Sequence, residues 1–196
     1  MNKTLVIAVA VSLLFAGSAW AEHEGHEAHS NASAIEKPVI AKVPAPIEVK
    51  PLQAVIEVDG LVCATCGYGI ERNMARLNFI DRKKFSHGVL TDIYNQKLVL
   101  ALVPKQPVDI KALSEAIHSA GYPLKVVHLR IAGTLEQKNG KTLLKDNETG
   151  QWFELQGDLP AAQTEVVLQV HIGQEQIKSY SPSNPVPVVV NRRLNR

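Results

Sequence analysis

The order of periodic segments between residues 54 and 131 limits the fold of this chain more than any other feature. Apolar residues recur every second position in some segments, as in strands, and every third or fourth position in others, as in helices. The segments run strand, helix, strand, strand, helix, strand over residues 54–58, 70–77, 89–94, 98–103, 110–117 and 125–131. A helix therefore follows the first and the third strand.

This order is that of a split βαβ arrangement, and it predicts a ferredoxin-like domain over residues 52–132. Its four-stranded antiparallel sheet would have two helices on one face. Beyond Gly133, glycines separate short runs rich in β-branched and aromatic residues. That spacing predicts a small all-β domain, a barrel or a meander, over residues 133–180. The predicted fold class is α+β, a ferredoxin-like βαββαβ domain followed by a small all-β domain.

The N-terminus resembles a secretory signal. Lys3 gives a positive start, residues 5–16 are almost entirely apolar, and small residues flank Trp20. We therefore expect residues 1–21 to be a cleaved signal peptide and the protein to be periplasmic or secreted. A retained anchor is the alternative, but the apolar run is shorter than the roughly 20 residues that span a bilayer. We expect no transmembrane segment in the mature chain.

Two further segments lack a strand or helix period. Residues 22–51 carry histidines and scattered prolines, which predicts a flexible arm. Residues 181–196 contain three prolines and end in a basic stretch, which predicts a flexible tail. The formal net charge of +2 is too small to indicate a polyanionic partner, so we expect no binding to nucleic acid.

The two cysteines of the chain, Cys63 and Cys66, fall where the first strand gives way to the first helix. A helix N-terminus favours the thiolate, which is the form that binds metal. Two thiolates are soft ligands and select Cu(I) over hard cations. Hg(II), Ag(I) and Zn(II) are also possible, although zinc prefers four ligands. The pair therefore predicts a metal site, with Cu(I) as the most favoured ion.

Residues 60–66 read Gly-Leu-Val-Cys-Ala-Thr-Cys, and Ser119 precedes an Ala-Gly-Tyr sequence that ends at Tyr122. These motifs resemble those of heavy-metal-associated domains, found in copper chaperones, in metal-transporting P-type ATPases and in periplasmic mercury-binding proteins. The resemblance covers about residues 52–131. It implies that Cys63 and Cys66 are the ligands and that Tyr122 lies near the thiols and shields them. The chain departs from the family at Leu61, where the family has methionine, and in a charged insert at residues 81–84.

Three other interpretations of the cysteines remain open. In an oxidising compartment the pair can form a disulfide or stay unligated. A CxxC motif between a strand and a helix also occurs in thiol-disulfide oxidoreductases. The absence of a tryptophan before Cys63 and the short domain disfavour that activity. The third interpretation is a protein-binding scaffold or regulatory subunit of an envelope assembly, in which the cysteines are incidental.

Histidines offer a second possible site. His23, His26 and His29 recur every three residues and can collect Cu²⁺, Zn²⁺ or Ni²⁺, or they are simply a solvated terminus. His128 and His171 lie in strand-like runs, and we expect both to point outward.

Taken together, the features of the sequence predict a carrier of a soft metal ion that is not an enzyme. Its partners would be metal-donor or metal-acceptor proteins of the envelope.

Overall fold

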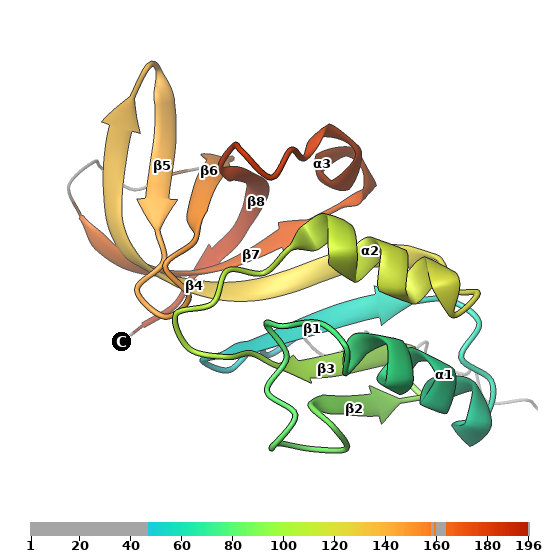
Figure 1. Cartoon of the computed structure of the whole chain (residues 1–196). Helices are drawn as coiled ribbons and strands as arrows, with labels where there is room; N and C mark the ends of the chain where they lie inside the picture. The colour runs from blue at the N-terminus through green and yellow to red at the C-terminus, as the bar shows by residue number, and fades with distance from the viewer. Residues whose placement is uncertain (1–46, 158, 160–163, 196) are drawn as a thin grey trace, which may run out of the picture. The chain divides into compact units, whose positions relative to one another are not determined.

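A computed structural model of the chain describes residues 47–157, 159 and 164–195. The predicted signal peptide, and most of the predicted arm with its three histidines, lie outside the described residues. In chain order the elements are β1 (Gln53–Val58), α1 (Ala64–Met74), β2 (Val89–Asp92), β3 (Lys97–Ala101), α2 (Ile110–Ser119), β4 (Leu124–Lys138), β5 (Lys141–Lys145), β6 (Trp152–Gln156), β7 (Glu165–Ile172), α3 (Gln174–Ser179) and β8 (Val186–Arg193) (Figure 1).

The strands form one eight-stranded mixed sheet in the order β2-β3-β1-β4-β5-β6-β8-β7. The predicted fold class, a ferredoxin-like domain followed by a separate all-β domain, is therefore wrong. Each of the six periodic segments overlaps a strand or helix of the expected type, although the first helix spans Ala64–Met74 and the fourth strand does not stop at residue 132. β4 is 15 residues long in all, runs through the expected domain boundary to Lys138 and joins the two halves into one sheet.

Gly133 misled the prediction because a glycine often marks the end of a strand. Here it lies inside β4, where another backbone segment comes very close. A Cβ atom at Gly133 would sit 2.2 Å from the carbonyl oxygen of Lys145, at the end of β5. A glycine within a strand commonly permits such an approach. This glycine therefore continues the sheet instead of ending it.

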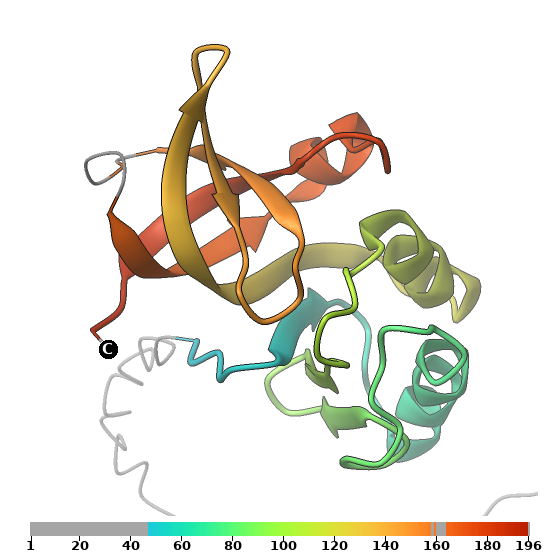
Figure 2. The same cartoon turned by 60° about the vertical axis from the view of Figure 1, so that its left-hand side comes forward.

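An additional pairing between β4 and β7 closes β4, β5, β6, β8 and β7 into a ring (Figures 1 and 2). All pairs in the ring are antiparallel except β6 and β8. Residues 127–129 of β4 pair with β1 on one edge and with β7 on the other. The ring thus shares its longest strand with the rest of the sheet.

The predicted flexible tail is also wrong over residues 186–193, because they form β8. Val186 and Val188 are buried, so this segment alternates as a strand does. Pro187 is tolerated because it precedes the part of β8 that pairs with β7. Only one edge of the strand needs hydrogen bonds at that point, which is where proline can occur in a sheet.

The turn between β5 and β6 ties the ring to the first half of the chain. The carboxylate of Glu148 accepts hydrogen bonds from the Leu52 amide, at 2.8 Å, and from the guanidinium of Arg130, at 2.7 Å. Asp146 is buried and accepts from the amide of Ala132 in β4 at 2.9 Å. Buried polar groups in folded proteins are almost always hydrogen-bonded, and here their partners lie in other segments. These hydrogen bonds hold the turn against both β4 and the segment before β1.

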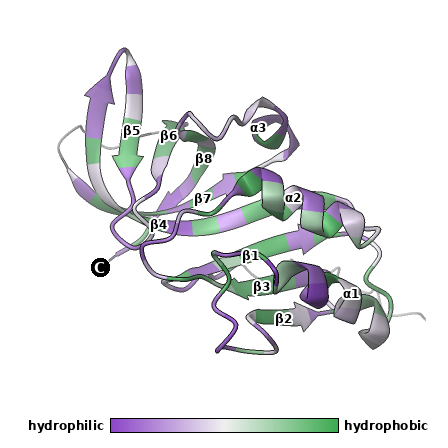
Figure 3. Cartoon of the chain, viewed as in Figure 1, coloured by the Kyte–Doolittle hydropathy of each residue, from purple (hydrophilic) through white to green (hydrophobic). Residues whose placement is uncertain are grey.

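The helices α1 and α2 lie together on one face of the sheet (Figure 1), and hydrophobic residues run along the strands beneath them (Figure 3). Ile70 and Met74 of α1 and Ile110, Leu113 and Ile117 of α2 are fully buried. Each such side chain contributes about 1.5–3 kcal/mol relative to an exposed one. This packing positions α1, whose first turn carries the cysteines. None of the helices in the described part of the chain is both long and apolar enough to cross a membrane.

His128 of β4 is buried, with 9% of its surface exposed, so the expectation that it points outward is wrong. It lies between two neighbouring strands: its Nε2 is 2.8 Å from the carboxylate of Glu57 in β1, and His171 of β7 is directly opposite in register. Burial lowers the pKa of His128 below its ordinary value of about 6.5, even though Glu57 acts in the other direction. The neutral imidazole is therefore the form that the fold accepts.

We predict that stability falls on mild acidification because of His128. Its pKa is lowered in the folded state, so the stabilising contribution is present above the unfolded pKa and is lost as the pH falls below about 6.5. Urea unfolding between about pH 7.5 and about pH 5.5 would measure the slope. The variant His128→Gln should flatten that slope, whereas the exposed His118→Gln should not. An unchanged slope in His128→Gln would show that another group is responsible.

A second prediction concerns Gly133. Gly133→Ala should lower the free energy of unfolding by about 1–3 kcal/mol or more, because the added Cβ collides with the Lys145 carbonyl. Gly69→Ala is the matched control, since no atom lies within 4 Å of a Cβ added there in α1. That variant should stabilise by about 0.5–1 kcal/mol through helix propensity. Chemical denaturation measures both, and equal effects of the two substitutions would contradict the close approach.

Candidate functional site

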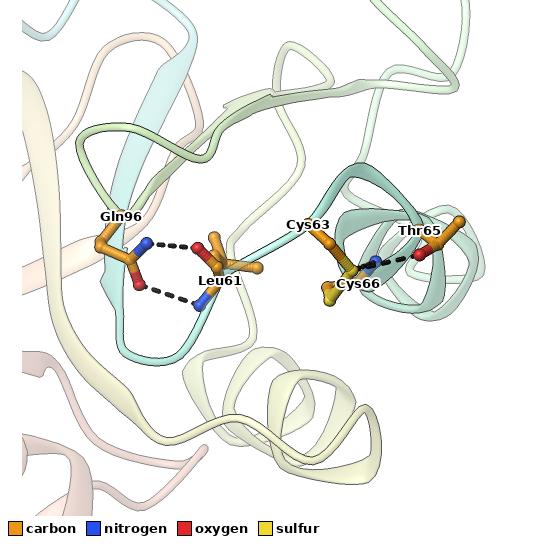
Figure 4. The surroundings of a disulfide bond; sticks show 5 residues. All are labelled: Leu61, Cys63, Thr65, Cys66 and Gln96. Atoms are coloured by element: carbon orange, nitrogen blue, oxygen red, sulfur yellow. Dashed lines mark hydrogen bonds between the residues drawn. A yellow bond between two sulfur atoms is a disulfide. The ribbon is translucent and has the colours of Figure 1, made fainter. Parts of the chain in front are cut away.

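Cys63 and Cys66 lie at the start of α1, where the chain leaves β1 and turns into the helix (Figure 4). Cys63 is the N-cap residue, with extended backbone angles of φ −151° and ψ 159°. Its sulfur accepts a hydrogen bond from the Cys66 amide at 3.2 Å and lies 3.1 Å from the hydroxyl oxygen of Thr65. A cysteine sulfur thus takes the capping position that the side-chain oxygen of serine or aspartate usually occupies at a helix start.

The two sulfurs are joined in a disulfide, with the Cα atoms 5.2 Å apart. The sequence left open whether the pair is a disulfide or two thiols, and in the structure it is a disulfide. A disulfide sulfur is not a thiolate, so this state offers no anionic ligand to a metal ion. The pair becomes a ligand set only after the disulfide has accepted two electrons and two thiols have formed.

The electrostatic surroundings favour the thiolate once the disulfide is reduced. Unpaired amides and the helix dipole place partial positive charge at a helix N-terminus. The first turn of α1 contains no acidic residue that would oppose a negative charge on sulfur. Thr65 can also donate its hydroxyl proton to the Cys63 sulfur. These features would lower the energy of a negatively charged sulfur at Cys63 or Cys66.

The loop before the cysteines is held by Gln96, in the turn between β2 and β3 (Figure 4). The side-chain oxygen Oε1 of Gln96 accepts from the Leu61 amide at 2.9 Å, and its side-chain nitrogen Nε2 donates to the Leu61 carbonyl at 2.5 Å. The Leu61 side chain is itself buried in the core. Sequence reasoning missed Gln96, because a glutamine in a polar turn gives no signal of the residue that it will contact.

The disulfide is accessible at the surface. Cys63 and Cys66 are partly exposed, and Thr65 between them is exposed. Two large apolar side chains near them also reach the solvent, Val62 with 81% of its surface exposed and Tyr68 with 65%. The sulfurs can therefore be approached by a large molecule as well as by a small one.

The other predicted site residues are not gathered around the sulfurs. The ring of Tyr122 lies beside Gly60, at the start of the loop that carries the cysteines. That position adjoins the loop, but shielding of the thiols by Tyr122 stays a prediction. His23, His26 and His29 lie outside the described residues. Within the part of the chain that the structure describes, no three side chains of histidine, cysteine, aspartate or glutamate are placed to hold one metal ion together.

Comparison with known proteins adds no assignment, because no protein-family model, curated protein or solved structure matches this chain. The resemblance to heavy-metal-associated domains therefore rests on the motifs at residues 60–66 and 119–122 alone and stays a prediction.

The two hydrogen bonds between the Gln96 side chain and the Leu61 backbone lead to a prediction. Gln96→Ala should lower the free energy of unfolding by about 1–3 kcal/mol, because the Leu61 amide and carbonyl each lose a partner. The Leu61 amide proton should also exchange faster with solvent, which NMR can measure. Tyr94→Ala in the same turn is the control, since that side chain is 94% exposed. If both variants left the exchange of Leu61 unchanged, Gln96 would not be the anchor of the loop.

Proposed function

We propose that this protein carries a soft metal ion, Cu(I) first, on the thiolates of Cys63 and Cys66. The observation that supports this proposal best is the arrangement of two accessible sulfurs at the N-terminus of α1, three residues apart. The spacing allows both sulfurs to converge on one ion, and the helix dipole favours their negative charge. The ion is the cargo of the protein and takes part in no reaction there.

Loading begins from the disulfide and needs a reductant, for which a dithiol of the envelope is the chemical class. One thiolate of that reductant attacks a sulfur of the Cys63–Cys66 disulfide, and the second thiolate then releases the mixed disulfide. The reductant leaves as a disulfide, and two thiols remain on this protein. Each thiol loses its proton when it binds the ion.

Two thiolate donors suit Cu(I) better than they suit hard cations or zinc. Soft sulfur ligands select Cu(I) over hard cations, whereas a structural zinc site usually has four ligands. Hg(II) and Ag(I) share this preference for sulfur and remain possible cargo. A two-coordinate ion also leaves room for an incoming ligand of a partner. Transfer would then proceed by ligand exchange, as the partner's thiolate or histidine enters and Cys63 or Cys66 leaves.

The predicted signal peptide supports a location in the periplasm or outside the cell. The partner would then be a metal-donor or metal-acceptor protein of the envelope. Exposed Val62 and Tyr68 beside the cysteines offer apolar surface for such a contact. The protein itself would be a carrier, with no catalytic step of its own.

A second candidate function is thiol-disulfide exchange, and the disulfide between Cys63 and Cys66 is the observation that favours it. In that function the same sulfurs would accept two electrons from a substrate dithiol and pass them on. Both functions use Cys63 and Cys66. A carrier holds a metal ion on the two sulfurs, whereas an exchange enzyme binds no ion and only alternates between disulfide and dithiol. A scaffold role, in which the cysteines are incidental, would survive replacement of both.

An anaerobic titration of the fully reduced protein with Cu(I), against a competing chelator, tests the proposal. We expect a tight one-to-one complex. The double variant Cys63→Ser, Cys66→Ser should bind Cu(I) more than about 100-fold more weakly. Replacing a residue that merely supports a metal ligand already lowers affinity by about 10–100-fold, and here both ligands themselves are lost. Tyr94→Ala, which leaves the cysteines in place, should bind as the wild type does.

Equal binding by the double variant would contradict the carrier function. An insulin-reduction assay with excess dithiothreitol separates the redox function from it. Rapid turnover that depends on both cysteines, without tight Cu(I) binding, would establish the exchange enzyme instead.

A further inference from the structure

A pocket of about 470 Å³ lies at the N-terminal end of α2, where the ring of strands meets the first half of the chain. Its wall comes from the start of α2, from the beginning of β6 and from the loop between α3 and β8. That volume lies within the range of about 300–1,000 Å³ that is usual for small-molecule sites. The proposed metal function uses none of its residues.

Trp152 gives this pocket a flat apolar surface. It is the first residue of β6, where Phe153 and Leu155 point into the core and Trp152 faces outward. Its exposed fraction of 36% is high for so large an apolar side chain. The ammonium group of Lys145 lies 5.9 Å from the centre of its ring, a cation–π contact that limits its movement. The pocket therefore contains a large, partly exposed aromatic side chain that lies outside the buried core.

Five uncharged polar side chains line the same pocket and make no side-chain hydrogen bond to any other part of the described chain. Three carry amides and two carry hydroxyl groups, so the set includes both donors and acceptors. They are Asn78, Gln106, Tyr180, Ser183 and Asn184. Hydrogen-bonding groups of this kind, gathered around an aromatic ring, are available to a ligand.

Gln151 differs from these side chains and gives the wall its rigidity. Its amide oxygen accepts from the Val108 amide at 3.0 Å, and its amide nitrogen donates to the Val108 carbonyl at 2.9 Å. Gln151 is buried, and it joins the β6 side of the pocket to the segment before α2. A preformed wall lowers the ordering cost of binding.

The charge of the pocket points to a neutral ligand. Among its lining residues, Asp109 alone is charged, and one of its carboxylate oxygens already caps α2 through the amides of Lys111 and Ala112. Burial, and then the charge of Asp109, raise the pKa of Tyr180, so its hydroxyl stays protonated at neutral pH. The lining offers hydrogen bonds and an aromatic face but no cation of its own, and the nearby ammonium group of Lys145 is already engaged with the Trp152 ring.

We propose that this pocket binds a neutral carbohydrate, with the apolar face of one sugar ring stacked on Trp152 and its hydroxyl groups bonded to the surrounding amides and hydroxyls. A sugar ring combines one face of C–H groups with a rim of hydroxyls, and the pocket presents the complement of both. A proline-rich peptide is the rival ligand, because polyproline helices also dock on grooves with tryptophan and tyrosine. The unused amides and hydroxyls favour the sugar, since a polyproline helix has no N–H group to donate to them.

Isothermal titration calorimetry of the full chain with cellotriose, maltotriose, tri-N-acetylchitotriose and decaproline tests this proposal. We expect saturable binding of at least one trisaccharide and none of decaproline. Trp152→Ala and Asn184→Ala should each weaken that binding by about tenfold or more, and Tyr94→Ala should leave it unchanged. Unchanged thermal unfolding of the variants checks that they are folded.

NMR gives an independent readout on the same samples. The indole N–H signal of Trp152, assigned by its absence from Trp152→Phe, should shift when the trisaccharide is added. Binding of no trisaccharide, or binding unaffected by Trp152→Ala in a folded protein, would overturn the proposal. Binding of decaproline alone would overturn it in favour of a peptide site.

Discussion

The arrangement of this protein depends on the unbroken pairing of β4 with three other strands. Its first residues pair with β1, its middle with β7, and its last four with β5. Hydrogen bonds along one continuous strand hold the cysteine-bearing half and the ring of strands as one sheet. The other links between the two halves include the turn between β5 and β6, the contact of α2 with α3 and the bond from Gln169 in β7 to Ile47. The position of α1, and therefore of its cysteines, follows from the part of the sheet that β4 and β1 build.

That pairing requires one unusual position, and Gly133 provides it. The backbone of β5 ends against β4 at Lys145, at a distance that leaves no space for a side chain. Nearby, the buried carboxylate of Asp146 accepts from the Ala132 amide and from both the amide and the hydroxyl of Thr149. A close approach of two backbones is thereby stabilised by a fully bonded polar cluster. Sheet and turn depend on each other at this point.

The sequence was informative where one residue pattern fixes one local structure. Periodicity placed strands and helices over residues 54–117, and the position of the cysteines between β1 and α1 followed from it. It failed where the outcome depends on contacts between distant segments. Gly133 looks the same in a sequence whether it ends a strand or permits a close approach, and His128 is buried only because β1 and β7 flank β4. Gln96 was missed for the same reason, since its bond to Leu61 spans 35 positions.

In the candidate site the start of the loop is held in place, while the cysteines that follow it remain accessible. Leu61 in the core and its clamp to Gln96 hold the loop, while Cys63 and Cys66 stay within reach of solvent. X-ray absorption spectroscopy at the copper edge, on the reduced protein loaded with one equivalent of Cu(I), identifies the atoms bound to the ion. Two sulfur ligands, from Cys63 and Cys66, are expected. A shell of nitrogen or oxygen ligands, unchanged when both cysteines are replaced by serine, would contradict the proposed carrier function.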